Sequence, residues 1–333
     1  MSSRPVAPTR HRTIRTSITG LAIALALIGV VGSEIASAGL LIGAHVRTPD
    51  RLSETEAIKR FEKKLGHRLP AVRLFYQWND SFPNATALWA RKTHHRVFMS
   101  FKARTSSNRY IKWRRIADAR PGTGIYRHLV DWAQGIKRYN ANVLFSFQPE
   151  PESWSGDPNG GPGDFKAAWR KVWHVFRSRG VRNAKFVWTM TGWAFRATDQ
   201  RAETNWWPGA KYVDAIGADV YNWYTCRGGG DGWDSLASDV RAIRRFARKW
   251  PRKEIYLPEF GSVEDRSRPR RKARWFKHIK RTFKRHRYRQ FAGLFYFHAR
   301  STDDGVCNWR VDSSRRSMRA FRGLTGDRFY RSG

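Results

Sequence analysis

Short β-rich segments alternate with helical stretches along nearly the whole chain, and this alternation limits the fold more than any other feature. Eight such segments occur, at Leu40–Val46, Arg73–Trp78, Arg96–Phe101, Val143–Phe147, Lys185–Met190, Val213–Tyr221, Glu254–Glu259 and Phe291–His298. Strands separated by helices pair in parallel, because each helix returns the chain to the start of the next strand. Eight repeats predict an α/β fold with a single (β/α)8 TIM barrel rather than an open sheet.

The intervening segments carry helix start and stop signals. Ser53 and Glu56 have the spacing of a capping box, in which each side chain bonds a backbone N–H that the first helical turn leaves free. Asp164 begins a second apolar-periodic stretch, and Gly180 suits the left-handed position that follows a helix. These signals support helices between the strands.

The first 38 residues have the pattern of a secretory signal peptide. Arginines precede an apolar run at Ile18–Val31, and Ala36-Ser37-Ala38 fits cleavage beside small residues. We therefore predict export, with 1–38 removed and one catalytic domain over 39–333. An uncleaved segment would tether the protein to the membrane instead.

The net charge of +37 raises nucleic-acid binding as an alternative. However, the basic residues are scattered through most of the predicted helices, and no DNA- or RNA-reading motif accompanies them. We expect no specific nucleic-acid partner. The charge suits electrostatic association with an anionic cell wall, or a solvated surface without any partner.

The chain has two cysteines, Cys226 and Cys307. In an exported protein they meet an oxidising compartment, where pairing is favoured. The sequence predicts that they form one disulfide, between the loops that follow the sixth and eighth strands. Two free thiols are the alternative.

Two glutamates stand at strand ends. In the fourth strand, period-two alternation places Gln148 and Glu150 on one face with Leu144. In the seventh strand, Ile255 and Leu257 share a face with Glu259 by the same reasoning. Because the carboxyl ends of barrel strands surround the active site, Glu150 and Glu259 are expected in one mouth. Two carboxyl groups there can divide acid/base and nucleophile roles in glycosidic cleavage.

Several motifs resemble those of glycoside hydrolase family 26, in the same order. They are Phe147-Gln148-Pro149-Glu150-Pro151-Glu152, Asp164–Arg170, Phe186–Thr189, Tyr212–Tyr221 and Leu257–Ser262. The resemblance covers most of the chain after residue 38. It implies a retaining mechanism with Glu150 as general acid/base and Glu259 as nucleophile, and most often endo-acting β-mannanase activity.

The resemblance also indicates residues that bind the substrate. Tyr221 matches the tyrosine that orients the nucleophile, and Asp219 shares its inward face, while Trp223 is expected to stack on a sugar. The family usually has a histidine before the acid/base glutamate, where this chain has Pro149. Gln148 is expected to contact the sugar in its place.

Glu152 shares the predicted face of Glu150 and is the second candidate for the acid. His45 and His298 end the first and eighth strands, so both are expected in the cleft. The histidines and cysteines lack metal-ligand spacing, and no Gly-x-Gly-x-x-Gly motif is present. We predict neither metal nor cofactor.

The sequence therefore predicts a secreted, monomeric glycosidase whose partner is its polysaccharide substrate, with endo-1,4-β-mannanase as the favoured activity. Sixteen tryptophans suit a protein that binds sugars. Two alternatives remain open. One is a carbohydrate-binding barrel without catalysis, which Pro149 suggests. The other is a protein that binds an anionic cell-wall polymer and does not use the barrel mouth.

Overall fold

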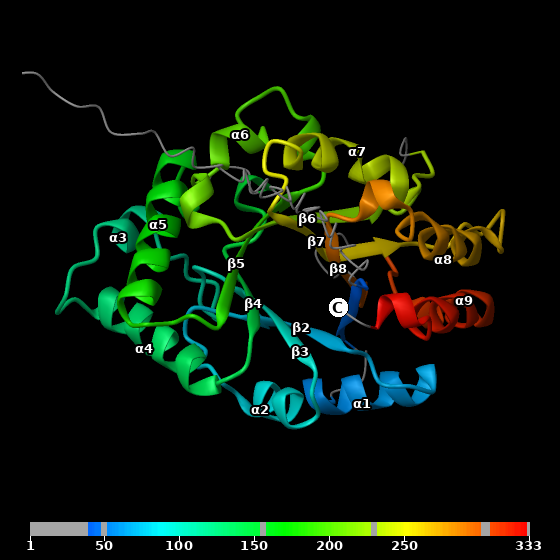
Figure 1. The fold of residues 1–333 in the computed structure, drawn as a ribbon, viewed down its shortest axis with the longest axis horizontal. Helices are drawn as coiled ribbons and strands as arrows, with labels where there is room; N and C mark the ends of the chain where they lie inside the picture. Colours follow the sequence, from blue (N-terminus) through cyan, green and yellow to red (C-terminus); the bar gives the residue numbers. More distant parts are fainter. Residues whose placement is uncertain (1–38, 48–51, 154–157, 228–231, 301–306, 332–333) are drawn as a thin grey trace, which may run out of the picture. The chain divides into compact units, whose positions relative to one another are not determined.

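The fold is a closed barrel of eight parallel strands in chain order, β1 to β8 (Figure 1). It was obtained as a computed structural model, which describes residues 39–47, 52–153, 158–227, 232–300 and 307–331. The strands are β1 (Leu41–Val46), β2 (Ala71–Tyr76), β3 (Arg96–Phe101), β4 (Val143–Phe147), β5 (Ala184–Thr191), β6 (Ala215–Asn222), β7 (Glu254–Ser262) and β8 (Phe291–His298). The predicted (β/α)8 barrel is confirmed.

Helices surround the strands, as Figure 1 shows. They are α1 (Glu54–Leu65), α2 (Ala85–Lys92), α3 (Trp113–Ala117), α4 (Gly124–Tyr139), α5 (Pro162–Ser178), α6 (Glu203–Trp206), α7 (Leu236–Ala247), α8 (Arg271–Thr282) and α9 (Arg315–Thr325). The predicted capping box is present, with Ser53 and Glu56 bonding each other's backbone N–H. The helix expected from Asp164 begins two residues earlier, because Pro162 suits its first turn.

The ring closes where α9, in red, lies next to α1, in blue (Figure 1). Phe61 of α1 contacts Phe321 of α9, with ring centroids 6.2 Å apart. Strand β1 also pairs with β8 over six residues. The first and last strand–helix units are thus joined in both the strand layer and the helix layer.

Each strand gives one side chain to a cluster inside the barrel: Leu41, Ala71, Phe98, Leu144, Val187, Ala215, Tyr256 and Phe295. The larger apolar core lies between the strands and the helices, where Phe145 of β4 packs on Phe176 of α5. The predicted facing of β4 is confirmed, since Leu144 points inward and Phe145 outward. Two packed layers therefore hold the strand ends in place.

The second strand lies two residues earlier than predicted. It begins at Ala71, which pairs with Arg96 of β3, and the predicted final residue Trp78 lies beyond its end. Arg73 is therefore an interior position of β2 rather than its first residue.

The predicted signal peptide, 1–38, lies outside the described residues. Within the part of the chain that is described, no helix has the length and apolar character needed to cross a membrane.

Candidate active site

Glu259 lies in the barrel mouth, but the alternation predicted for β7 is wrong. Tyr256 points into the barrel, whereas Ile255 and Leu257 belong to the core that faces the helices. The pairing of β7 with β8 shifts register between Leu257 and Phe260. This irregularity resets the alternation and brings Glu259 to the inner side.

Two donors hold the Glu259 carboxylate. Nη2 of Arg73 donates to Oε1 at 2.9 Å, and the hydroxyl of Tyr221 donates to Oε2 at 2.5 Å. Burial would raise the pKa of Glu259, but the Arg73 charge and these two hydrogen bonds outweigh it. The pKa therefore lies below its ordinary value, and Glu259 is ionised near neutral pH.

Arg73 projects from the interior of β2 and is almost completely buried. Its guanidinium carbon lies 4.5 Å from the ring centre of Phe75 and 4.7 Å from that of Phe98. A buried charge needs a partner, and Glu259 is its ion-pair partner among the described residues. We did not identify Arg73 from the sequence, although an arginine flanked by apolar residues in a predicted strand is an available signal.

Glu150 reaches the mouth from a turn rather than from a strand. Strand β4 ends at Phe147, and both Gln148 and Glu150 have positive φ angles, of 44° and 51°. The backbone N–H of Glu150 donates to the carbonyl of Thr189 on β5 at 3.0 Å. Left-handed backbone is unfavourable for residues other than glycine and is often found at functional sites.

The pKa of Glu150 rises to about 8. Burial is the main cause, and the negative charges of Glu259 and Glu152 add to it, whereas Lys102 and Arg73 oppose it. Glu150 therefore holds its proton near neutral pH while Glu259 does not. One carboxyl group can donate a proton and the other can attack.

Gln148 is held by the backbone. Its Oε1 accepts a hydrogen bond from the N–H of Ala103 at 2.8 Å, and the residue is buried. This bond fixes the segment that follows β3. The structure therefore gives Gln148 a structural contact, and its contact with a sugar remains a prediction.

Glu152, the second candidate for the acid, lies in the short 3-10 helix η1 (Pro151–Ser153). Its Oε1 accepts a hydrogen bond from the N–H of Thr191 at 2.7 Å, and burial raises its pKa to about 7. Because one carboxyl oxygen of Glu152 is hydrogen-bonded to the backbone at the end of β5, Glu150 is the better placed acid.

Asp219 and Lys102 are two further ionisable groups near the glutamates. Neither carboxyl oxygen of Asp219 has a hydrogen-bond partner among the described residues. Burial and the charges of Glu259 and Glu150 raise its pKa well above the ordinary value, which favours the protonated form of Asp219. Burial lowers the pKa of Lys102, whose charge acts on both glutamates, and its Nζ lies 5.6 Å from the ring centre of Phe75. Lys102 was not identified from the sequence.

The two histidines have different surroundings. His45 stacks on Phe297 with ring centroids 5.1 Å apart, and its Nδ1 lies 3.4 Å from the carbonyl oxygen of Arg73. Burial lowers its pKa to about 4, and the charge of Glu259 acts on it. His45 is therefore a neutral ring near Glu259, and its contact with a sugar remains a prediction.

His298, in contrast, does not face the cleft. Its ring packs 4.2 Å from that of Phe61 on α1, and its Nδ1 accepts a hydrogen bond from the N–H of Val311. The residue is 1% exposed. It points outward because it shares the parity of Leu294 and Tyr296, so its predicted role in substrate binding is contradicted.

Aromatic residues form one wall of the mouth. Tyr221 contacts Trp223 and Trp309, with ring centroids 5.3 Å and 4.6 Å apart. Trp309 is buried and was not identified from the sequence. The guanidinium carbon of Arg227 lies 3.1 Å from the ring centre of Trp223. Sugar stacking on Trp223 remains a prediction.

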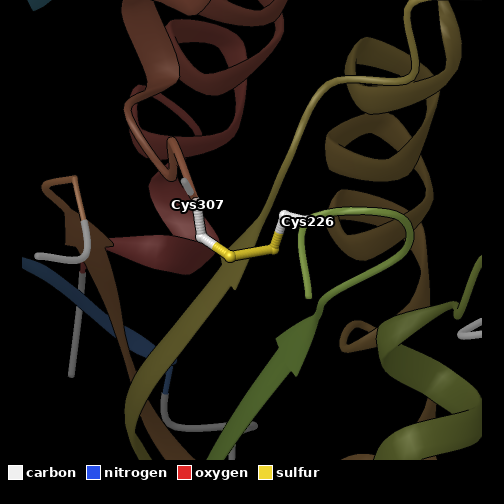
Figure 2. Close-up of a disulfide and its surroundings, with 2 residues drawn as sticks. All are labelled: Cys226 and Cys307. Atoms are coloured by element: carbon white, nitrogen blue, oxygen red, sulfur yellow. A yellow bond between two sulfur atoms is a disulfide. The ribbon is translucent and has the colours of Figure 1, made fainter. Parts of the chain in front are cut away.

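A disulfide holds this wall. Cys226, after β6, is bonded to Cys307, after β8, as Figure 2 shows. Their α-carbons lie 5.2 Å apart and their separation in sequence is 81 residues. The predicted pairing is confirmed. Both cysteines belong to the same cluster as Trp223 and Trp309, so the bond fixes the side of the mouth that carries Tyr221.

The barrel, with an ionised and a protonated glutamate in one mouth, defines the class of (β/α)8-barrel glycosidases. The chain is similar to glycoside hydrolase family 26. The model of glycosyl hydrolase family 26 matches residues 91–237, which include Glu150 and Tyr221 and end before Glu259. The resemblance seen in the sequence motifs is thereby confirmed.

A curated relative is endoglucanase H of Acetivibrio thermocellus, which is 26% identical over 328 residues. The match covers 95% of this chain and 33% of that protein, so the chain spans about a third of the relative's length.

Two solved structures have similar folds. An endo-β-1,4-mannanase of Cellulomonas fimi superposes with a TM-score of 0.60 at 19% identity, over 88% of this chain and 72% of that one. The catalytic domain of a family 26 endo-β-1,4-mannanase from Bacillus sp. JAMB-750 has the same TM-score at 14% identity, over 88% and 86% of the two chains. These identities are low, so the likeness shows a shared fold.

Proposed function

We propose that the chain hydrolyses a β-1,4-mannan from within the polymer, with retention of anomeric configuration. The observation that carries this proposal is the contrast between Glu259 and Glu150. Arg73 and Tyr221 keep Glu259 ionised, whereas burial keeps the pKa of Glu150 near 8. A retaining glycosidase needs this division between nucleophile and acid.

In the proposed mechanism, Glu259 attacks the anomeric carbon while Glu150 protonates the departing glycosidic oxygen. The anomeric carbon–oxygen bond breaks as the bond to Glu259 forms. Glu150, now ionised, then takes a proton from water, which attacks the anomeric carbon and releases Glu259. Tyr221 and Arg73 hold the nucleophile in position, and Tyr221 lies where it can stabilise charge near the reacting carbon.

Mannan is proposed as the polymer because structures of similar fold are named endo-β-1,4-mannanases. The name of the curated relative, endoglucanase H, makes β-glucan the second candidate. We also propose that the chain acts as an exported monomer after loss of 1–38, with electrostatic association to an anionic wall. Mass spectrometry of the secreted protein tests the expected start near Gly39, and recovery of intact 1–38 in membranes would contradict it.

The central experiment measures reducing ends released from β-mannan, glucomannan and mixed-linkage β-glucan. Glu259→Ala is expected to abolish release from every polymer that the parent cleaves. Glu150→Ala should keep cleavage of aryl glycosides with good leaving groups, because these depart without protonation. Glu203→Ala is the matched control, since Glu203 of α6 makes no ion pair with any other described residue.

Proton NMR of the first product tests retention, which requires the β-anomer to form first. Sugar binding without turnover by the parent would instead identify a carbohydrate-binding barrel. If Glu152→Ala stops polysaccharide cleavage while Glu150→Ala does not, the assignment of the acid is wrong.

A further inference from the structure

A second hollow lies on the same face of the barrel as the two glutamates. It has a volume of about 630 Å³, within the range of pockets that bind small ligands. Its lining comes from Trp78, after β2, and from the connection between β3 and the first turn of α4. It comprises Trp78, Arg109, Tyr110, Ile111, Arg114, Arg115, Asp118, Ala119, Thr123, Gly124 and Ile125. Segments that follow strands lie at the carboxyl-terminal face, where the active site also lies.

Buried hydrogen bonds fix the shape of this pocket. The N–H of Ile111 donates to the carbonyl of Ala103 at 2.8 Å, which folds the connection back on the end of β3. Asn159 is 3% exposed, and its amide donates to the carbonyls of both Ala103 and Ile111, at 2.7 and 2.8 Å. The carbonyl of Asn159 also accepts from the N–H of Trp113. The pocket is therefore preorganised.

The pocket combines positive charge with an apolar wall. Arg114 pairs with Asp118, with Nε and Oδ2 2.7 Å apart. Arg109 and Arg115 are exposed and make no ion pair with any other described residue. Tyr110 and Ile111 are half-buried in the wall. The pocket therefore has two uncompensated guanidinium groups beside apolar surface.

We propose that this pocket binds a uronic acid residue of a polysaccharide. The sugar carboxylate would pair with Arg109 and Arg115, because guanidinium groups match a planar carboxylate with paired hydrogen bonds. The apolar face of the sugar ring would lie on Tyr110 and Ile111. Asp118 in the wall disfavours ligands with several negative charges, which favours a single carboxylate over a chain of phosphates.

This inference rests on the proposed function, because it concerns the polysaccharide that the barrel would cleave. It states that this polysaccharide carries uronic acid residues. It extends that function to a substrate class, a β-glycan with uronic acid units, and assigns Arg109 and Arg115 as the residues that select it. The positions of Glu150 and Glu259 do not enter the binding itself, so binding and hydrolysis can be tested separately.

The test is calorimetric titration with two hexasaccharides that differ only at C6, β-1,4-linked hexamannuronate and mannohexaose. Both titrations use the Glu150→Gln variant, so that cleavage does not obscure binding. Hexamannuronate is expected to bind more tightly than mannohexaose. Adding R109Q and R115Q together should weaken hexamannuronate binding by about tenfold or more and leave mannohexaose binding within about twofold.

The matched control is R138Q with R281Q. Arg138 and Arg281 lie in the last turns of α4 and α8, at the opposite end of the barrel. This control removes the same charge, so it should leave hexamannuronate binding within about twofold. Equal weakening by both double variants would show a diffuse electrostatic effect and overturn the proposal.

Three other results would also overturn it: no preference for hexamannuronate, equal loss of mannohexaose binding, or tighter binding of a six-nucleotide RNA that the same R109Q and R115Q changes abolish. Failure of the proposed hydrolysis is recognised independently, because it leaves the parent inactive on every polymer while the binding difference persists. Thermal unfolding checks that each double variant is folded.

Discussion

Replacing Arg73 by methionine tests how the nucleophile is kept ionised. The variant keeps an apolar side chain of similar length but removes the donor 2.9 Å from Oε1 of Glu259. A hydrogen bond to a charged group contributes about 1.5–3 kcal/mol, and removing one partner of a buried ion pair costs about 3–5 kcal/mol. With about 3 kcal/mol lost and about 1.4 kcal/mol for each pKa unit, the pKa of Glu259 should rise by about two.

The sign of the effect follows from the role of Glu259, which attacks only when ionised. A higher pKa moves the acidic limb of the kcat/KM profile toward higher pH by about two pH units. Because the pKa of Glu259 starts below 4.5, a rise of about two still leaves most of the carboxylate ionised at neutral pH, so the loss of kcat/KM should be far larger at acidic pH than at neutral pH. Arg73→Lys should recover part of the lost kcat/KM, since lysine restores the positive charge but lacks the planar N–H donors of a guanidinium group.

The assay is the pH dependence of kcat/KM on an aryl β-mannoside, with thermal unfolding to confirm that the variants fold. Arg91→Met is the control, because Arg91 is an exposed arginine that donates a hydrogen bond to the carbonyl of Tyr139 and not to a carboxylate. An acidic limb that stays in place in folded Arg73→Met would refute the reasoning, even if activity falls.

Three further changes test the same site. Tyr221→Phe removes the second donor to Glu259 and should lower kcat/KM by about 10- to 100-fold, with the acidic limb raised in steady-state profiles. Lys102→Met removes a charge that lowers the pKa of both glutamates, so both limbs of the profile should move to higher pH; a shift of either limb to lower pH would contradict the assignment. Replacing Cys226 and Cys307 by serine should reduce the free energy of unfolding by about 2–4 kcal/mol in urea titrations, and a reductant should then have no further effect.

The barrel could be predicted because its signals are local. Apolar runs of strand length and caps such as Ser53 depend on neighbours within a few residues, so they are legible in one sequence. The predicted boundaries of β2 were less accurate. Trp78 continues the apolar pattern of the strand, but its N–H donates a hydrogen bond to the carbonyl of Arg104, outside the sheet. Whether a strand ends at Tyr76 or Trp78 depends on its neighbour in space.

The facing of side chains was harder to predict wherever alternation is interrupted. His298 follows the regular alternation of β8 and so turns away from the cleft, which its position at a strand end does not reveal. Glu259 reaches the cleft only because β7 shifts register after Leu257. Alternation alone, counted from Tyr256, would have turned Glu259 toward the helices.

The division of labour between the carboxyl groups follows from where the donors lie. Glu150, Asp219 and Glu259 share one buried mouth, and burial acts against ionising any of them. Only Glu259 receives hydrogen bonds from both a guanidinium and a phenol hydroxyl, whereas the carboxyl oxygens of Asp219 have no hydrogen-bond partner among the described residues.

The negative charge is therefore localised on Glu259, and this charge then helps to keep protons on the other two groups. Arg73 thus influences both catalytic roles: it lowers the pKa of the nucleophile directly, and it sustains the charge that raises the pKa of Glu150. Because Arg73 also lowers the pKa of Glu150 through its own charge, its two effects on the acid oppose each other. Loss of Arg73 should consequently move the acidic limb of the pH profile much more than the alkaline limb.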